Sequence, residues 1–198
     1  MERTLHAESQ ANIPVRAPRR WLFLLSLPHG LVPFGSVLVF FAMGGALWTL
    51  FIPFLWVFVV VPALDLLIGE DVTSPPETDY DALQADRFYT HLIFATLPTY
   101  VISFLAAMFV LATQDIPLWT ALPFLYAVGI ASGQSITLAH ELGHRTNTLD
   151  RNVAKLSLAL VGMGHFCIEH NRGHHVRVAT PEDCSSARMN ETVYGFAY

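Results

Sequence analysis

The stretch WLFLLSLPHGLVPFGSVLVFFAMGGALWTLFIPFLWVFVVVPAL, residues 21–64, contains no aspartate, glutamate, lysine or arginine. A helix needs about 20 apolar residues to cross the roughly 30 Å hydrocarbon core of a bilayer, so this stretch is long enough for two crossings. The glycine pair Gly44-Gly45 marks the break between them. We therefore expect one membrane span near 21–42 and a second near 47–68.

Two more stretches lack charged side chains, from residue 90 to 114 and from 116 to 139. We expect them to form spans near 92–113 and 118–139. Charged residues make up only 14% of the chain, against about 25% in soluble domains. Four apolar stretches of this length are too many for the buried core helices of a soluble protein. The chain is therefore predicted to be an all-α, polytopic membrane helical bundle with about four transmembrane helices.

Positive charges predict the orientation of the chain in the lipid bilayer. All eleven lysine and arginine residues lie before residue 21, between 69 and 91, or after 139. Such residues concentrate in cytoplasmic segments, so the N-terminus and the chain after 139 are predicted to be cytoplasmic. Residues 1–20 are predicted to form a cytoplasmic tail, because their charges and the long span that follows do not fit a cleaved signal peptide. The tail's arginines are more simply topology determinants than an arm that binds nucleic acid.

Carboxylates are concentrated between the second and third spans, in residues 69–90. The simplest interpretation is a solvated loop, with a short surface helix over Tyr80–Tyr89; a docking face for a partner is the alternative. Asp65 differs from these carboxylates because it lies inside, or at the end of, an apolar span. An ionisable residue at membrane depth has a functional or structural role. Asp65 either accepts a hydrogen bond from a metal-bound imidazole or reaches the membrane interface.

Five of the nine histidines occur in two short groups. His140 and His144 belong to HELGH at the cytoplasmic end of the fourth span, and one helical turn separates them, so both rings project from one face. His170, His174 and His175 belong to EHNRGHH. In an α-helix His170 and His174 would share a face, with His175 about 100° away from His174. Imidazole suits iron, zinc, copper and nickel, so the two groups predict a metal site.

The chain between the two histidine groups is apolar at helical spacing, at Val153, Leu156, Leu160, Val161 and Met163. This periodicity predicts an interfacial or partly embedded helix. The histidines of EHNRGHH would therefore lie on a cytoplasmic or interfacial helix. Both cysteines, Cys167 and Cys184, lie on the reducing side of the membrane, so no structural disulfide is expected.

HELGH alone matches the HExxH pattern of zinc metalloproteases, in which the two histidines bind zinc and the glutamate is the general base. Such a site needs only one further ligand and one position for water. The three histidines of EHNRGHH exceed that need and favour more than one ion, or a coordination number above four. From the residues alone, two alternatives stay open. One is an intramembrane zinc metalloprotease that uses His140, Glu141 and His144, and the other is a non-enzymatic metal transporter or chaperone.

The blocks HELGH, GMGHFCIEHNRGHH and VATPEDCSSARMNETVYGF, with ALDLLIGEDVTSPPE before them, resemble the membrane-bound alkane 1-monooxygenases. These enzymes belong to the histidine-box superfamily of fatty-acid desaturases and hydroxylases. The resemblance extends from about residue 50 to the end of the chain, in the same order and spacing. Acyl-lipid desaturases share only the box pattern, and a histidine-box enzyme that acts on lipids is a further alternative.

The resemblance implies a six-span fold in the inner membrane of a bacterium, with a non-haem di-iron centre on the cytoplasmic side. It also implies O₂-dependent terminal hydroxylation of n-alkanes to 1-alkanols, with electrons from rubredoxin and its reductase. The histidines implied to be iron ligands are His140, His144, His170, His174 and His175. In this interpretation Glu141 and Glu169, together with Asp65, are candidates to orient ligand imidazoles through hydrogen bonds. Zinc is redox-inert and could not support the oxidation of an alkane.

The chain also departs from this family. No histidine follows His175, so the third histidine box and the additional histidine of the family are missing. We therefore expect residues 21–198 to be the N-terminal, incomplete part of a di-iron hydroxylase domain, with the remaining ligands beyond residue 198. The chain as given is expected to be inactive. The remaining histidines, His6, His29, His91 and His165, are expected to be structural or, for His165, to support a ligand. A long alkane has no polar group, so an apolar channel between the spans is expected, because burial of each CH₂ contributes about 0.8 kcal/mol.

Overall fold

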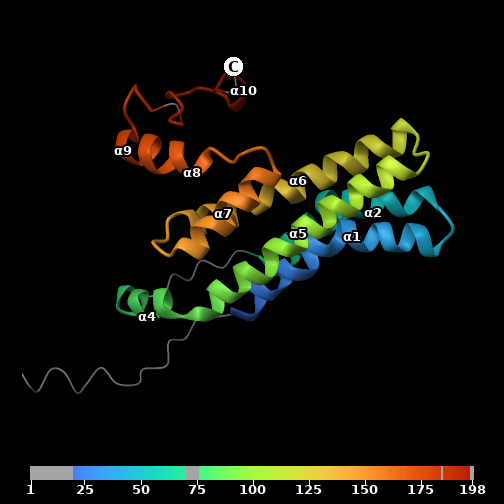
Figure 1. Ribbon diagram of the computed structural model, residues 1–198, viewed down its shortest axis with the longest axis horizontal. Coiled ribbons are helices and arrows are strands. Elements are labelled where there is room, and N and C mark those ends of the chain that lie inside the picture. The colour runs from blue at the N-terminus through green and yellow to red at the C-terminus, as the bar shows by residue number, and fades with distance from the viewer. Residues whose placement is uncertain (1–19, 70–75, 184, 197–198) are drawn as a thin grey trace, which may run out of the picture.

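The computed structural model describes residues 20–69, 76–183 and 185–196, and every regular element within these ranges is helical (Figure 1). Four helical segments are long and apolar enough to cross a membrane: Arg20–Ala42, Leu47–Ile68, Arg87–Thr113 and Leu118–Gly143. The four predicted spans and the all-α class are thus confirmed. The third span begins five residues earlier than expected, and the fourth runs four residues further, so that it carries His140 within the helix.

The first two spans form a hairpin. The first span joins a 3₁₀ turn, η1 (Arg20–Leu25), to α1 (Ser26–Ala42), and the turn that follows uses positive φ angles of 66° at Gly44 and 90° at Gly45. Glycine reaches these angles without steric cost. The turn lies at the break that the sequence predicted. In Figure 1 this turn and the one between α5 (Arg87–Thr113) and α6 (Leu118–Gly143) lie at the same end of the bundle.

The second span is irregular along its length. It consists of η2 (Leu47–Phe51), α2 (Ile52–Leu55), a π-type turn η3 (Trp56–Val60) and α3 (Val61–Ile68). Pro62 lies two residues after the end of the π turn. Proline has no N–H and its ring crowds the preceding turn, which accounts for the wider helix at this position.

Helices α1 and α5 approach each other closely at Gly30. A Cβ atom on Gly30 would lie 2.0 Å from Thr99 Oγ1, so only glycine allows the two backbones to come this near. Pro33 interrupts the hydrogen-bond ladder of α1 in the same region. Ser103 of α5 occupies the gap: its Oγ donates to Gly30 O at 2.6 Å and accepts from Phe34 N at 3.3 Å. A hydroxyl from the neighbouring helix thereby satisfies backbone groups that lipid cannot.

Two clusters of buried apolar side chains hold the bundle together. The first lies between α1, η2, α5 and α6 and comprises Val37, Phe40, Leu50, Ala107, Val110, Phe124 and Val128. The second joins α5 and α6 to α7 (Thr148–Leu160) and comprises Leu97, Ala139, Leu142, Ala154 and Leu158. Leu142 stands within HELGH, so the second cluster fixes the end of α6 that carries His140 and His144.

The segment between the second and third spans breaks where a continuous helix was expected. A 3₁₀ turn, η4 (Glu77–Asp79), leads into α4 (Tyr80–Ala85), which ends before Asp86. The Asp86 carboxylate accepts a hydrogen bond from Phe88 N at 2.8 Å and caps α5. An aspartate N-cap starts a new helix, so the predicted surface helix over 80–89 becomes two elements.

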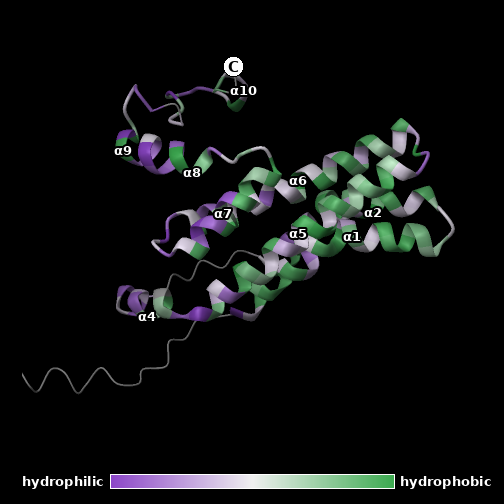
Figure 2. Cartoon of the chain, in the orientation of Figure 1, coloured by the Kyte–Doolittle hydropathy of each residue, from purple (hydrophilic) through white to green (hydrophobic). Residues whose placement is uncertain are grey.

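The chain after α6 turns back along the bundle. Asn147 caps α7 by accepting from Leu149 N at 2.9 Å, and α7 packs on α6 where the sequence predicted an amphipathic helix. Three short elements follow: α8 (Phe166–Glu169), the π-type turn η5 (His170–His174) and α9 (His175–Arg177); α10 (Val193–Phe196) comes last. Figure 2 shows that polar residues gather on α4, α7 and the α8–α9 segment, away from the apolar bundle.

Several predicted features lie outside the described residues. They are His6 and the rest of the tail before Arg20, residues 70–75 of the acidic loop, and Cys184. The division of the chain into a tail and a domain at residue 20 stays a prediction. Cys167, which is described, is a free thiol.

Candidate metal centre

The first two candidate ligands stand at the end of α6. His140 lies within the last turn of the helix, and His144 is its C-terminal cap with helical backbone angles. The rings are neighbours, with centroids 4.6 Å apart. This is the arrangement that the spacing of HELGH predicts, since the helix continues to its last residues without interruption.

A π-type turn presents the second group of histidines. In η5 the His175 backbone N–H donates to His170 O, which is a hydrogen bond between residues five apart. The wide turn places residues five apart above one another, and π turns of this kind recur at functional sites. His170 and His175 therefore come together, with ring centroids 4.5 Å apart, although α-helical geometry would separate them. The spacing of EHNRGHH contains no signal that distinguishes the two turns.

Four imidazoles converge on one point. The Nε2 atom of His140 lies 2.6 Å from that of His144 and 2.8 Å from that of His170. The Nε2 atom of His170 lies 3.0 Å from that of His175. All four ligand atoms lie within 4.8 Å of one another. Nitrogen ligands about 2.1 Å from one ion and at right angles to each other would be about 3.0 Å apart, so these four fit the surroundings of a single first-row metal ion.

The fifth candidate, His174, is placed beside this group of four. Its ring is stacked against His170, with centroids 5.3 Å apart and planes 21° apart. Its Nδ1 donates to Asp183 Oδ2 at 2.8 Å. The structure thus brings four of the five predicted ligands together and gives the fifth a carboxylate partner. Sequence reasoning missed Asp183, since only the fold of the loop after α9 brings it near His174.

Burial and mutual repulsion affect the protonation of these groups. Burial, and after it the neighbouring histidines with His140 first, lower the pKa of His170 to about 4. A neutral imidazole at physiological pH is the form that binds a metal ion. The hydrogen bond from Ser186 is the largest cause that lowers the pKa of Asp183 below its usual range, so Asp183 is a carboxylate.

The two predicted glutamates have other partners. Glu141 pairs with Arg145 at 3.8 Å, and its side chain is 61% exposed. Glu169 pairs with His165 at 3.6 Å and is 65% exposed. Neither carboxylate has a hydrogen bond to one of the five candidate ligands within the described residues. The prediction that they orient ligand imidazoles therefore receives no support from these contacts and stays a prediction.

Asp65 lies on α3 in the second span, beside a cavity that His29 and Trp56 also line. His29 is held between two other spans: the Trp56 indole N–H donates to His29 Nδ1 at 2.9 Å, and His29 Nε2 pairs with the Gln134 amide oxygen. Both ring nitrogens of His29 are satisfied, as a structural role requires. Asp65 has no hydrogen bond to the five candidate ligands among the described residues, and its suggested role stays a prediction.

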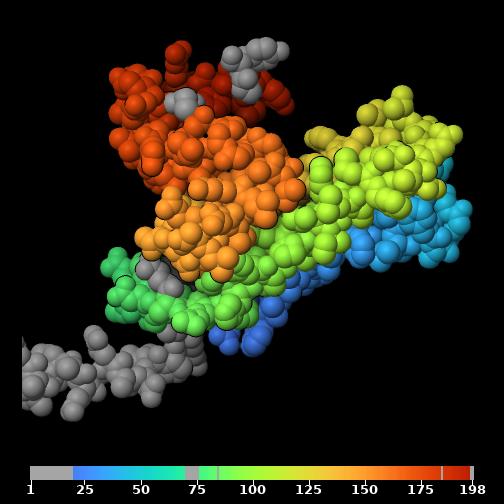
Figure 3. Space-filling model, in the orientation of Figure 1, coloured from blue at the N-terminus to red at the C-terminus, as the bar shows by residue number. Residues whose placement is uncertain are grey.

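Residues of the neighbouring elements hold the end of α6 and the η5 turn in place. Arg145 donates to Thr90 Oγ1 of α5 at 2.7 Å and lies 3.8 Å from the buried carboxylate of Asp150 on α7. On the other side, the Phe166 ring stacks on His170, with centroids 4.8 Å apart. Asn171 Nδ2 donates to Gly143 O at 3.3 Å and ties η5 to the end of α6. Figure 3 shows the segment after α7 standing out from the bundle on the side of α7.

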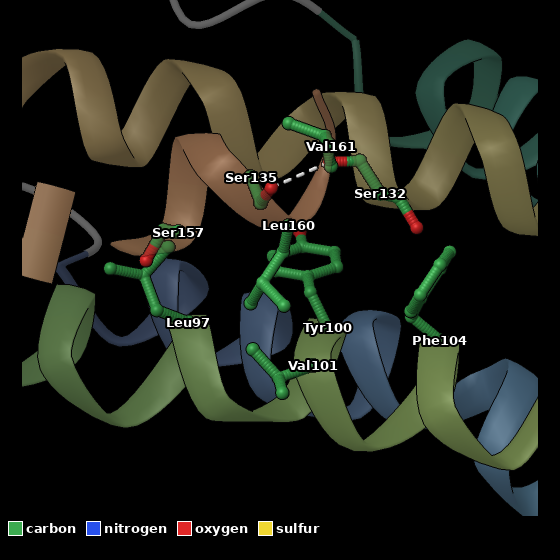
Figure 4. Close-up of a pocket in the computed structure, with 9 residues that line it drawn as sticks. All are labelled: Leu97, Tyr100, Val101, Phe104, Ser132, Ser135, Ser157, Leu160 and Val161. Carbon is green, nitrogen blue, oxygen red and sulfur yellow. Dashed lines mark hydrogen bonds between the residues drawn. The ribbon is translucent and has the colours of Figure 1, made fainter. Parts of the chain in front are cut away.

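Two larger hollows adjoin the centre. One is a groove near the end of α6 that includes His144, Arg145 and Asp150. The other is an apolar cleft between the first, third and fourth spans, lined by residues such as Leu22, Leu92 and Leu138. Phe23 and Tyr89 line both hollows, so the two lie next to each other at these rings. A third, smaller cavity lies between α5, α6 and α7, where Tyr100 and Phe104 face Ser132, Ser135 and Leu160 (Figure 4).

Comparison with known proteins agrees with this geometry. The fatty acid desaturase family model matches residues 117–198, which include both histidine groups. Alkane 1-monooxygenase 1 of Alcanivorax borkumensis is 37% identical over 179 residues, which is 90% of this chain and 44% of that protein. An alkane 1-monooxygenase of Pseudomonas putida is 39% identical over 138 residues, or 70% of this chain and 34% of that protein.

A more distant relative is the hydroxylase component of the xylene/toluene monooxygenase of Pseudomonas putida, 26% identical over 146 residues. The chain spans less than half of the length of each of these three relatives, 44%, 34% and 39%.

Proposed function

This chain belongs to the alkane 1-monooxygenase family, within the fatty acid desaturase superfamily, and we propose that it takes part in the O₂-dependent hydroxylation of n-alkanes to 1-alkanols. The observation that carries the proposal is the convergence of four Nε2 atoms from α6 and the η5–α9 segment. The two sequence segments, about thirty residues apart, bring four imidazole nitrogens within reach of one point, as the ligands of a single first-row metal ion would be.

We propose that the metal is iron and that the centre holds two ions. His140, His144, His170 and His175 would hold one ion, and His174, set apart from them, would contribute to the other. Iron would supply the exchange of electrons with O₂ that a zinc ion cannot. The protein's part is to keep the imidazoles neutral and oriented, which the π turn and the neighbours of His170 achieve.

The apolar cleft between the first, third and fourth spans is the proposed entry for the alkane. Leu22, Leu92 and Leu138 line it, and Phe23 and Tyr89 line both this cleft and the groove at His144. Binding there would depend on removal of CH₂ groups from water or lipid rather than on hydrogen bonds, at about 0.8 kcal/mol for each group transferred from water. An apolar cleft of this kind suits a substrate that has no polar group.

Rubredoxin, supplied by its reductase, is the proposed electron donor. The proposal rests on the family, and it requires the histidine groups to face the cytoplasm, as the distribution of basic residues predicts. The acidic segment around α4 is a poor docking face for an acidic donor, because like charges repel across an interface.

A zinc metalloprotease is the competing function. It needs Glu141 free to act as a base beside the metal, yet this side chain points to Arg145 and solvent. It also leaves one of His170 and His175 without a purpose, because a zinc site of this kind needs three protein ligands and HELGH already supplies two. A histidine-box enzyme that acts on lipids would share the same metal ligands and differ in substrate.

Metal analysis of the full-length protein, purified from iron-replete membranes, tests the proposal. Near two irons per chain, without zinc, is the expected content of a complete centre. One zinc per chain and no iron would overturn it in favour of a protease. A substrate assay with octane, rubredoxin, its reductase and ¹⁸O₂ then separates alkanes from lipids, because labelled 1-octanol arises only from alkane hydroxylation.

We expect the 198-residue chain alone to form no alkanol. Five imidazoles cannot fill the coordination positions of two iron ions, so the centre would lack ligands. Alkanol production by this chain on its own would contradict the expectation. The natural reading frame offers a second test: if it continues beyond Tyr198 without another histidine box, the di-iron assignment fails.

A further inference from the structure

We infer that Asp183 is a positioning residue for His174, holding its imidazole in the tautomer whose Nε2 is free to bind a metal ion. This inference rests on the proposed metal centre and assigns a part of it outside the two histidine groups. Asp183 lies in the loop after α9, nine residues beyond the histidine that it contacts.

The geometry of the pair determines the tautomer. His174 Nδ1 lies 2.8 Å from Asp183 Oδ2, and a carboxylate can only accept a hydrogen bond. In the neutral ring the proton therefore resides on Nδ1, which leaves the lone pair on Nε2 free to bind a metal ion. A carboxylate behind a ligand imidazole also raises the basicity of the ligand and fixes the plane of its ring.

Asp183 is itself held by the loop. Its side chain is 0% exposed. Ser185 N donates to Oδ1 at 3.0 Å, and Ser186 Oγ donates to Oδ2 at 2.5 Å. Ser186 Oγ in turn accepts from Ala179 N at 3.1 Å. A buried carboxylate that receives three donors is part of a built site, because an unpaired one would be costly to bury.

The pair also explains why His174 stands apart from the group of four. Its ring is stacked on His170, yet its Nδ1 is turned to Asp183. Among the five candidate ligands, His174 has the one carboxylate partner found in the described part of the chain. The other four are oriented by one another and by Phe166 instead.

The variant Asp183→Asn provides a sharp test. Ser185 N–H can only donate, so the amide oxygen of asparagine takes the place of Oδ1 and its NH₂ takes the place of Oδ2. The NH₂ then donates to His174 Nδ1, and the ring proton moves to Nε2, where it blocks the metal. The size and shape of the side chain stay the same.

The first measurement is the ¹⁵N NMR spectrum of His174 in the metal-free 198-residue chain in lipid nanodiscs. The wild type should show protonated Nδ1, and D183N should show protonated Nε2. Asp183→Glu should retain the wild-type tautomer, as should the control Glu182→Gln, which changes the exposed neighbouring carboxylate. A wild-type ring protonated on Nε2 would overturn the inference, as would a D183N spectrum identical to the wild type.

The second measurement is the affinity for Co²⁺, followed by its visible absorption. D183N should weaken binding of the ion that His174 holds about 10- to 100-fold, the usual effect of removing a carboxylate behind a ligand histidine, and should leave the affinity of the four-histidine site unchanged. In a His174→Ala background the same change should cause no further loss. A loss of equal size in both backgrounds would overturn the inference. Absence of Co²⁺ binding by the wild type would contradict the proposed metal centre, and the tautomer measurement would still test Asp183.

Discussion

His170 and His175 are five residues apart in the chain, yet their Nε2 atoms lie 3.0 Å apart. The π-type turn η5 causes this approach, because its hydrogen bond runs from His175 N–H to His170 O. In a regular α-helix residues five apart differ by about 140° around the axis and could not face one point. The wide turn is thus the local feature on which the four-histidine site depends.

Loss of one converging imidazole should weaken metal binding. We expect His175→Ala and His170→Ala each to lower the affinity for Co²⁺ more than about 10-fold, since even partners behind the ligands contribute 10- to 100-fold. His165→Ala is the control, because His165 pairs with Glu169 instead of the cluster. Isothermal titration of the purified chain measures the affinities. Equal binding by H175A and H165A would show that η5 does not present a ligand.

Metal should order the segment from Phe166 to Arg177. No residue of α8, η5 or α9 is fully buried, so apolar packing alone holds this segment weakly. A ligand at 100 times its Kd stabilises the state that binds it by about 2.7 kcal/mol. We expect Co²⁺ to slow amide hydrogen exchange in residues 166–177, EDTA to reverse this, and the buried part of α5 to stay unchanged. An amide exchange rate in residues 166–177 that stays the same when Co²⁺ is added would contradict this prediction.

Gly30 should be intolerant of a side chain. Gly30→Ala places a Cβ atom 2.0 Å from Thr99 Oγ1, and overpacking of this kind costs about 1–3 kcal/mol. Gly35→Ala is the matched control on the same helix, because a Cβ there meets nothing within 4 Å. Unfolding in mixed micelles measures both variants. Thr99→Ala combined with G30A should recover part of the loss, and equal stability of G30A and G35A would contradict the close approach.

Arg145 should be required at the junction of α5, α6 and α7. Arg145→Ala removes a donor to Thr90 and leaves the buried Asp150 carboxylate without its cation, which costs about 1–3 kcal/mol or more. Arg151→Ala, one residue beyond Asp150 and exposed, is the control. Thermal unfolding followed by circular dichroism should show a lower midpoint for R145A only. An unchanged thermal unfolding midpoint in R145A would show that Arg145 is not required at this junction.

Much of the fold follows from local composition. Uncharged stretches of about 20 residues must be helical in a bilayer, because lipid offers no partners for backbone groups. This physical constraint made the four spans predictable, with errors of a few residues at their ends. The start of α5 is one such error. The Asp86 carboxylate caps the helix there and divides the continuous helix that was expected over 80–89.

The candidate site was predictable only in part. HELGH lies on an uninterrupted α-helix, so the spacing of His140 and His144 was sufficient to place them on one face. EHNRGHH was different, because the choice between an α and a π turn depends on packing against α6. Phe166 and Asn171 make those contacts with His140 and Gly143.

Hydropathy and residue type alone therefore determined the membrane class, the number of spans and the presence of a histidine-rich candidate metal site. These properties follow from short-range rules: the length needed to cross a bilayer and the ligand chemistry of imidazole. The tertiary structure decided which histidines converge, that His174 instead meets Asp183, and that Glu141 pairs with Arg145. Each of these depends on contacts between elements or loops whose relative placement comes from packing, which residue spacing does not encode.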